Sequence, residues 1–146
     1  MPPMLGAFGI GVANMDRSVK FYRDTLQIGL TPTTFFDVDS FTETIMTFPK
    51  GAKPTGSQII LMEYKNAPAP KNQQGKFVFY VEDVKAVMDR CKAYGCEVFL
   101  DLGAGTGWTK DIGMVRDPDG FLVEFLPLKA LRSSANWGDK VDSAKI

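Results

Sequence analysis

The stretch Arg116-Asp-Pro-Asp-Gly-Phe-Leu-Val-Glu-Phe-Leu126 decides how the C-terminal part of the chain folds. Its Asp-Pro-Asp-Gly segment, residues 117–120, predicts a turn, because proline presets φ, aspartate accepts hydrogen bonds from nearby backbone N–H groups, and Gly120 tolerates positive φ. The apolar run at residues 121–126 predicts a strand that begins directly after this turn. Glu124 is the single charge in that run, so it either faces solvent or points inward for a functional reason.

Length and composition predict one globular domain. The chain has 146 residues and is 45% hydrophobic, enough to bury about two thirds of its unfolded surface. It carries 17 basic and 17 acidic residues without a basic run, which gives no indication of a nucleic acid or a membrane surface as partner. The apolar start, residues 1–13, is glycine-rich and short, so it predicts a strand and not a signal peptide. A small-molecule partner is expected instead.

The two cysteines, Cys91 and Cys96, fall near the end of one predicted helix. This arrangement favours reduced thiols and a cytoplasmic location over a disulfide framework. A redox pair at the helix end is the alternative interpretation.

The first half of the chain predicts one strand, one helix and three further strands. Asn14 offers a side-chain cap for the helix, and Gly29 ends it. Runs of apolar and β-branched residues between turn residues indicate the strands. The predicted strands cover residues 5–12, 30–38, 41–48 and 58–64.

The second half repeats this order after a proline-rich polar linker, residues 66–75. Asp83 caps its helix, and it lies 69 positions after Asn14. We therefore predict an α+β domain, residues 1–128, in which two β-α-β-β-β modules form a curved mixed sheet around a cup. The modules cover residues 5–65 and 76–128, with second-module strands at residues 76–81, 97–102, 109–115 and 121–126.

The tail, residues 129–146, is polar with isolated Leu131 and Trp137. Its composition does not demand a fold. Two interpretations stay open, a tail without structure and a tail that places Trp137 against a neighbouring subunit.

Three motifs, in this order, resemble the vicinal oxygen chelate superfamily, which includes glyoxalase I, bleomycin- and fosfomycin-resistance proteins and extradiol dioxygenases. The motifs are residues 14–26, residues 81–84 with the helix that follows them, and residues 116–124. The resemblance extends from residue 5 to about residue 128. It implies the doubled fold, a homodimer, and a cup that holds a small organic ligand.

The resemblance also implies where a metal would bind. Metal-using members place one ligand on each of the first, fourth, fifth and eighth strands, and the matching positions here are Ala7, Leu61, Lys76 and Glu124. Only Glu124 keeps the ligand type, and Glu63 is the one nearby substitute. The chain has no histidine, and alanine, leucine or a protonated lysine cannot coordinate a transition metal. We therefore predict a protein that uses neither a metal nor another cofactor.

Glu124 and Lys76 are the predicted catalytic residues. We expect them to meet in the cup, with Glu124 as general base or acid and Lys76 stabilising an enolate or carboxylate. The other predicted site residues come from the alternation of side chains along strands and from the glycine-rich loop at residues 103–107. These predicted ligand-binding residues are Glu63, Tyr80, Leu61, Leu122, Trp108 and Phe36.

Three functions are compatible with these residues. The first is a metal-independent lyase or isomerase of glyoxalase-like ancestry that acts on a small organic molecule. The second is a binding protein of the drug-resistance type, which sequesters a ligand without chemistry. The third is a metal-dependent enzyme like lactoylglutathione lyase. A further alternative assigns the cup no function. In that case the protein's own side chains fill the cup, and the Lys76–Glu124 pair is purely structural.

Overall fold

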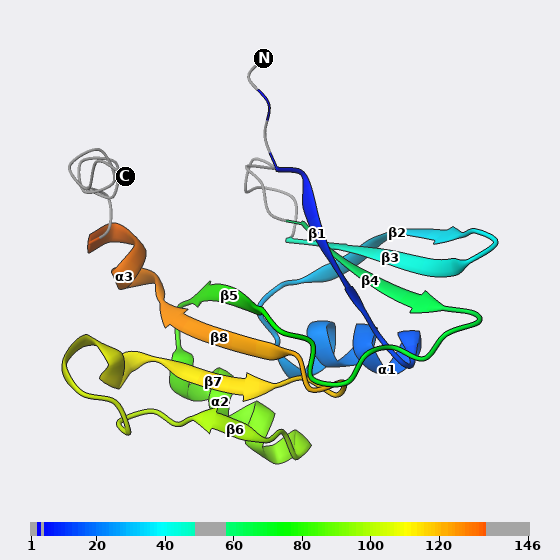
Figure 1. Ribbon diagram of the computed structural model, residues 1–146. Coiled ribbons are helices and arrows are strands. Elements are labelled where there is room, and N and C mark those ends of the chain that lie inside the picture. The colour runs from blue at the N-terminus through cyan, green and yellow to red at the C-terminus, as the bar shows by residue number, and fades with distance from the viewer. Residues whose placement is uncertain (1–2, 4, 49–57, 134–146) are drawn as a thin grey trace, which may run out of the picture.

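The computed structural model describes residue 3, residues 5–48 and residues 58–133. In this part of the chain, eight strands form two four-stranded sheets, with strand orders β1-β4-β3-β2 and β5-β8-β7-β6 (Figure 1). Each sheet comes from one half of the chain and mixes parallel with antiparallel neighbours. The predicted α+β fold of two β-α-β-β-β modules is therefore confirmed, with two sheets in place of a continuous one.

The first module begins its helix where the sequence predicts. The Asn14 side chain accepts a hydrogen bond from the Arg17 N–H at 3.0 Å. The helical turns continue through Phe21–Thr25, where the Leu26 N–H reaches the carbonyl of Phe21, five residues earlier. The elements of this module are β1 (Ala7–Gly11), α1 (Met15–Lys20), β2 (Thr31–Asp37), β3 (Phe41–Thr47) and β4 (Gln58–Tyr64).

The second module repeats this design. Asp83 accepts a hydrogen bond from the Ala86 N–H at 2.9 Å, and α2 begins 69 positions after α1. Both modules place their first and last strands side by side in parallel. The elements are β5 (Lys76–Val81), α2 (Val84–Tyr94), β6 (Val98–Leu100), β7 (Gly113–Arg116), β8 (Leu122–Pro127) and α3 (Leu128–Ser133).

The loop before β7 differs from the prediction of a strand at residues 109–115. Gly107–Asp111 form a 3-10 turn, and β7 begins only at Gly113. The Thr109 hydroxyl accepts a hydrogen bond from the Thr106 N–H and donates one back to the Thr106 carbonyl, at 2.9 and 2.7 Å. These side-chain bonds offer the backbone an alternative to the strand ladder.

The chain continues past β8 as a short helix. α3 occupies Leu128–Ser133, so the beginning of the predicted tail is folded. Trp137, which the sequence analysis singled out, lies outside the described residues. None of the helices in the described residues has the length and hydrophobicity needed to cross a bilayer.

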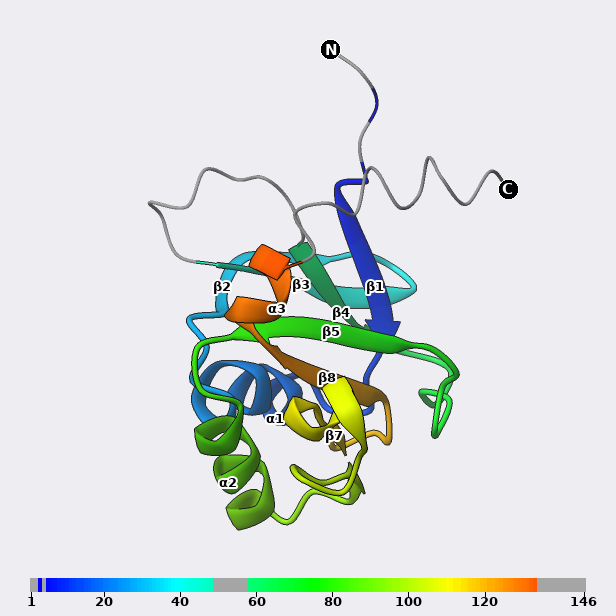
Figure 2. The same cartoon turned by 90° about the vertical axis from the view of Figure 1, so that its left-hand side faces the viewer.

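One hydrophobic core is shared by both modules. Phe77 of β5 lies between the two modules. Its ring centroid is 5.9 Å from that of Phe8 and 6.0 Å from that of Tyr22 in the first module, and 4.9 Å from that of Phe121 in the second. The helical segments of the two modules also meet. Arg90 of α2 donates hydrogen bonds to the carbonyls of Thr25 and Leu26, at the end of the helical turns that follow α1, at 3.1 and 2.7 Å. Figure 2 shows β5 and β8 crossing the middle of the molecule, with the first sheet above them and α2 below.

The linker is attached to the edge of the first sheet. The Gln73 amide nitrogen donates to the Gly11 carbonyl at 2.8 Å, and its oxygen accepts from the Gly11 N–H at 3.4 Å. β1 is an outer strand of its sheet. The Gln73 side chain thus occupies the hydrogen-bonding groups that a further strand would use at this position.

Candidate functional site

The turn at residues 117–120 has the chemistry that the sequence predicts. Asp117 is buried, and its Oδ1 accepts hydrogen bonds from the backbone N–H groups of Asp119 and Phe121, at 2.9 and 2.8 Å. Gly120 has a φ of +84°, and a Cβ at this position would lie 1.9 Å from the side-chain oxygen of Asn72. The turn therefore sets the direction in which β8 leaves it.

β8 places Glu124 between Val78 of β5 and Met114 of β7. The Glu124 side chain is 6% exposed, and the Lys76 Nζ donates a hydrogen bond to its Oε2. Lys76 is 45% exposed and pairs in register with Leu122, so its side chain reaches diagonally along the sheet to Glu124. The structure thus brings the two expected catalytic residues together.

Apolar side chains surround this pair on one side of the second sheet, which we call the open face. Along β5, exposed residues alternate with buried ones. The exposed residues lie on the same side of the sheet as Lys76 and Glu124. Cross-strand register adds the neighbours on β7 and β8. The open face therefore carries Lys76, Val78, Tyr80, Met114, Arg116, Leu122, Glu124 and Leu126.

Sequence reasoning missed Arg116, a second cation on the open face. Arg116 pairs in register with Leu122, its Nη1 donates to the Gly120 carbonyl at 2.9 Å, and its guanidinium lies 5.5 Å from the Phe99 ring centre. The sequence could have indicated this, because Arg116 directly precedes the 117–120 turn. If the strand is extended to Arg116, strand alternation places its side chain on the side opposite Val115. The predicted strand stopped one residue too early to include it.

The residues of β4 that face away from the core are not the ones that the sequence predicts. Leu61 is 0% exposed and lies in the core, so it cannot line the open side of the first sheet. Its neighbours Ile60 and Met62 are only partly buried and face the other way, with Ile60 beside Gly9 of β1.

The structure distributes three other predicted ligand-binding residues over separate places. The Glu63 carboxylate accepts a hydrogen bond from the Met15 N–H at 3.1 Å, at the start of α1. Phe36 lies on β2 of the first sheet, and Trp108 lies on the 3-10 turn before β7, where it is 79% exposed. Tyr80 and Leu122 do share the open face with Glu124. Ligand binding by any of these five residues stays a prediction.

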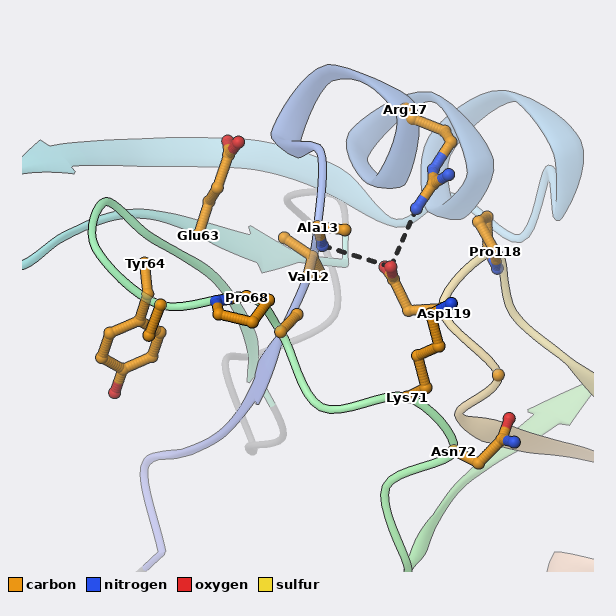
Figure 3. Close-up of a pocket in the computed structure, with 13 residues that line it drawn as sticks. Val12, Ala13, Arg17, Glu63, Tyr64, Pro68, Lys71, Asn72, Pro118 and Asp119 are labelled. Atoms are coloured by element: carbon orange, nitrogen blue, oxygen red, sulfur yellow. Dashed lines mark hydrogen bonds and ion pairs between the residues drawn. The ribbon is translucent and has the colours of Figure 1, made fainter.

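A cleft of about 640 Å³ lies where the linker, the start of α1 and the 117–120 turn meet. On its wall, Asp119 accepts hydrogen bonds from the Ala13 N–H at 3.2 Å and from Arg17 at 2.8 Å. Figure 3 shows Arg17 and Asp119 pointing toward each other, with Glu63 on a different side of Ala13. Lys76 and Glu124 do not line this cleft. The cleft is thus separate from the open face.

The doubled fold and the turn before β8 agree with a family match. The chain matches the sequence model of the Glyoxalase/Bleomycin resistance protein/Dioxygenase superfamily over residues 5–125. The chain belongs to this superfamily.

The chain is similar in sequence to two lactoylglutathione lyases or probable ones. It is 27% identical to a lactoylglutathione lyase of Haemophilus influenzae over 126 residues, covering 84% of this chain and 90% of the relative. It is 29% identical to a probable lactoylglutathione lyase of Vibrio parahaemolyticus over 124 residues, covering 81% and 86%.

Two solved structures share the fold. One is the trypanothione-dependent glyoxalase I of Leishmania major, with a TM-score of 0.78, 22% identity and coverage of 98% of this chain and 99% of that one. The other is TnmS3, an antibiotic-binding protein from Streptomyces sp. CB03234, with a TM-score of 0.64, 21% identity and coverage of 86% and 96%.

The side chains at the superfamily's metal positions do not fit a transition metal. Ala7 has no donor atom, Leu61 is apolar and buried in the core, and Lys76 presents an ammonium to Glu124. The sequence has no histidine, and no three His, Cys, Asp or Glu side chains in the described residues come together as a metal site.

Proposed function

We propose that this glyoxalase-superfamily protein is a lyase or isomerase that moves a proton at a carbon next to a carbonyl group. The observation that supports this most strongly is the Lys76–Glu124 ion pair. A carboxylate that is 6% exposed is costly to keep unless it is paired, and here its partner lies on a face that is otherwise largely apolar. General bases are commonly held in this kind of environment.

The geometry assigns different tasks to the two groups. Lys76 is nearly half exposed, so a substrate oxygen can reach its ammonium from the open side. When the substrate carbonyl takes this hydrogen bond, the Glu124 carboxylate gives up part of its contact with Lys76 and is free to accept a proton. Glu124 then accepts the proton from the adjacent carbon, and Lys76 stabilises the negative charge that develops on the oxygen.

Met114, Val78 and Leu122 are suited to binding the substrate and excluding water. They are the cross-strand neighbours of Glu124 and Lys76, and they are apolar. Low polarity around the pair strengthens its electrostatic effect on a bound oxyanion. We assign Arg116 a positioning role, because its guanidinium is already held by the Gly120 carbonyl and the Phe99 ring.

We further propose that two copies of the chain associate in the cytoplasm as a homodimer. Val78, Tyr80 and Phe36 are large side chains that are all more than one third exposed on the two sheets of a single chain. Exposed apolar side chains of this kind on both sheets favour a protein partner. A second copy over the open face would convert an exposed surface into an enclosed pocket.

A ligand-sequestering protein is the second candidate. The missing metal donors and the apolar neighbours of Tyr80 favour it, because binding without chemistry needs an apolar, aromatic surface and no proton carrier. The identities with lactoylglutathione lyases favour an enzyme instead. A metal-dependent lactoylglutathione lyase is the third candidate, and the donor set at the four positions argues against it.

Hydrogen exchange distinguishes an enzyme from a ligand-sequestering protein. S-lactoylglutathione, the compound in the relatives' name, is incubated with the protein in D2O, and exchange of the hydrogen next to its carbonyl is followed by NMR. We expect Glu124→Gln to lower the exchange rate about 100-fold or more while ligand binding is kept. Lys76→Met is expected to lower it too.

The matched control is Lys85→Met, which removes an exposed lysine from the ion pair with Asp89 on α2 and leaves the open face intact. It is expected to exchange at the parental rate. If Glu124→Gln and Lys76→Met exchange as fast as the parent, the pair is structural and the proposed chemistry is wrong. Binding without any exchange in the parent would favour the sequestering protein.

A further inference from the structure

The end of α2 brings the two cysteines together. Gly95 follows the helix with a φ of +98°, and its N–H donates to the Lys92 carbonyl at 3.0 Å. The Cys96 N–H donates to the Cys91 carbonyl, also at 3.0 Å. This is a Schellman motif, in which the residue after the glycine packs against the residue five positions before it. Here both members of that contact are thiols.

The two thiols differ in exposure. Cys91 is buried in the hydrophobic core, whereas Cys96 is only partly buried and packs against the edge of that core. Interaction with the Cys96 thiol, followed by burial, raises the pKa of Cys91, whereas interaction with Cys91 lowers the pKa of Cys96 against the opposing effects of burial and Asp117. Cys96 is thus the thiol that solvent reaches and that ionises more readily.

The backbone on either side of the cysteines is held in place. Cys91 lies within the helix, in the core, and the segment after Cys96 is attached to β7, because the Arg116 N–H donates to the Glu97 carbonyl at 2.9 Å. The hydrogen bond from the Cys96 N–H to the Cys91 carbonyl therefore holds the two residues together at the end of α2, and the two thiols can meet without a change elsewhere in the fold. A disulfide needs this proximity of the two side chains.

We propose that Cys91 and Cys96 are a modification site, where hydrogen peroxide converts the two thiols into a reversible disulfide within one chain. The Cys96 thiolate attacks one peroxide oxygen, the O–O bond breaks, and the second oxygen leaves as water after protonation. The Cys96 sulfenic acid is then attacked by the Cys91 sulfur, so the S–S bond forms, the S–O bond breaks, and the Cys91 proton leaves with that oxygen as water. Two thiols lose two electrons, and one peroxide becomes two waters.

This site is independent of the Lys76–Glu124 pair. It lies at the end of α2, and the peroxide is consumed at sulfur with no part played by the open face. Reduction by a small dithiol returns both cysteines to thiols. The proposal therefore stands or falls separately from the proposed enzyme activity.

The test treats the folded full-length chain with hydrogen peroxide and then counts thiols by alkylation under denaturing conditions and mass spectrometry. We expect the parent to lose both alkylatable thiols together, with a mass lower by two hydrogen atoms and one peptide pair that links residues 91 and 96. Dithiothreitol should restore both thiols. Two thiols still free after peroxide treatment, or a bond between two chains, would overturn the proposal.

Single variants identify the order of the steps. In Cys91→Ser, the Cys96 sulfenic acid has no partner, so we expect it to be trapped by dimedone. In Cys96→Ser, we expect Cys91 to stay a free thiol under the same treatment, because it is buried. Circular dichroism checks that each variant is folded, and the parent alone decides the outcome if either is not. Dimedone labelling of Cys91 in the Cys96→Ser variant would contradict the assignment of Cys96 as the reacting thiol.

Discussion

The Tyr22 hydroxyl donates a hydrogen bond of 2.7 Å to Oδ2 of Asp117, and this bond joins residues 95 positions apart in sequence. Tyr22 follows α1 in the first module, and Asp117 begins the turn before β8 in the second. Both side chains are buried, and the other oxygen of Asp117 is used by its own turn. One carboxylate thus shapes a local turn and also joins the two modules.

Removing this hydroxyl should weaken the whole fold. Tyr22→Phe leaves a buried Asp117 oxygen without its donor, so we expect the free energy of unfolding to fall by about 1 to 3 kcal/mol. Urea denaturation measures this change. Tyr80→Phe is the matched control, because Tyr80 is exposed on the open face, and it should change stability by less than about 0.5 kcal/mol. Equal effects of the two substitutions would contradict a stabilising role for the Tyr22–Asp117 bond.

Stability should also fall at alkaline pH because of Tyr22. Burial, followed by the nearby Asp117 charge, raises the pKa of Tyr22 well above its ordinary value of 10.0. The unfolded chain therefore releases this proton at about pH 10, while the folded chain keeps it. The contribution is complete below that pH and is lost as pH rises toward the folded-state pKa. In urea denaturation at increasing pH, the stability difference between the parent and Tyr22→Phe should shrink above about pH 10; a constant difference would contradict this.

The Lys76–Glu124 pair should show strong energetic coupling. Lys76→Met leaves the buried Glu124 without its cation, and we expect a loss of about 1 to 3 kcal/mol, part of which Glu124→Gln restores in the double variant. A double-mutant cycle by urea denaturation measures the coupling. The exposed Lys65–Asp37 pair provides the control, with an expected coupling of about 0.2 to 1 kcal/mol. Similar coupling energies in both cycles would mean that the burial of Glu124 does not strengthen its ion pair with Lys76.

Gly120 should tolerate substitution less well than Gly95. Both have positive φ, so alanine is strained at either position by about 1 kcal/mol. At Gly120, the added Cβ would also lie 1.9 Å from the Asn72 side-chain oxygen, whereas nothing lies within 4 Å at Gly95. We therefore expect Gly120→Ala to lower the thermal unfolding temperature more than Gly95→Ala does. Equal losses would show that Asn72 moves away freely.

The purified protein should hold no stoichiometric zinc, nickel, iron or manganese. Ala7 and Lys76 stand at two of the superfamily's ligand positions, and a lone Glu124 binds such ions weakly. Elemental analysis of the protein after dialysis measures the content. A metal near one equivalent that is lost in Glu124→Ala would contradict this prediction and favour a metal-dependent enzyme.

The sequence predicted those features that depend on local chemistry. Asn14 and Asp83 cap their helices as expected, because capping needs only a side-chain acceptor and the next few backbone N–H groups. The pairing of Lys76 with Glu124 was predictable from the family pattern and the high cost of burying a lone charge.

Other features depend on choices that local sequence does not express. Residues 59–62 of β4 are all apolar, so composition alone does not say which side of the strand faces the core, and Leu61 was assigned to the wrong one. The turn at Gly107–Asp111 is decided by hydrogen bonds of Thr109, which compete with a strand of similar composition. Arg116 was missed because the end of β7 is fixed by pairing with β8.

The attachment of Gln73 to Gly11 has a consequence for how copies of this chain can meet. An outer strand such as β1 is normally a template onto which another chain can add, and proteins protect such edges to avoid aggregation. Here the amide of Gln73 occupies the outward N–H and carbonyl of Gly11. Sheet extension across this end of β1 would have to detach the linker first, so association through the broad sides of the sheets is favoured over the growth of an open-ended fibre.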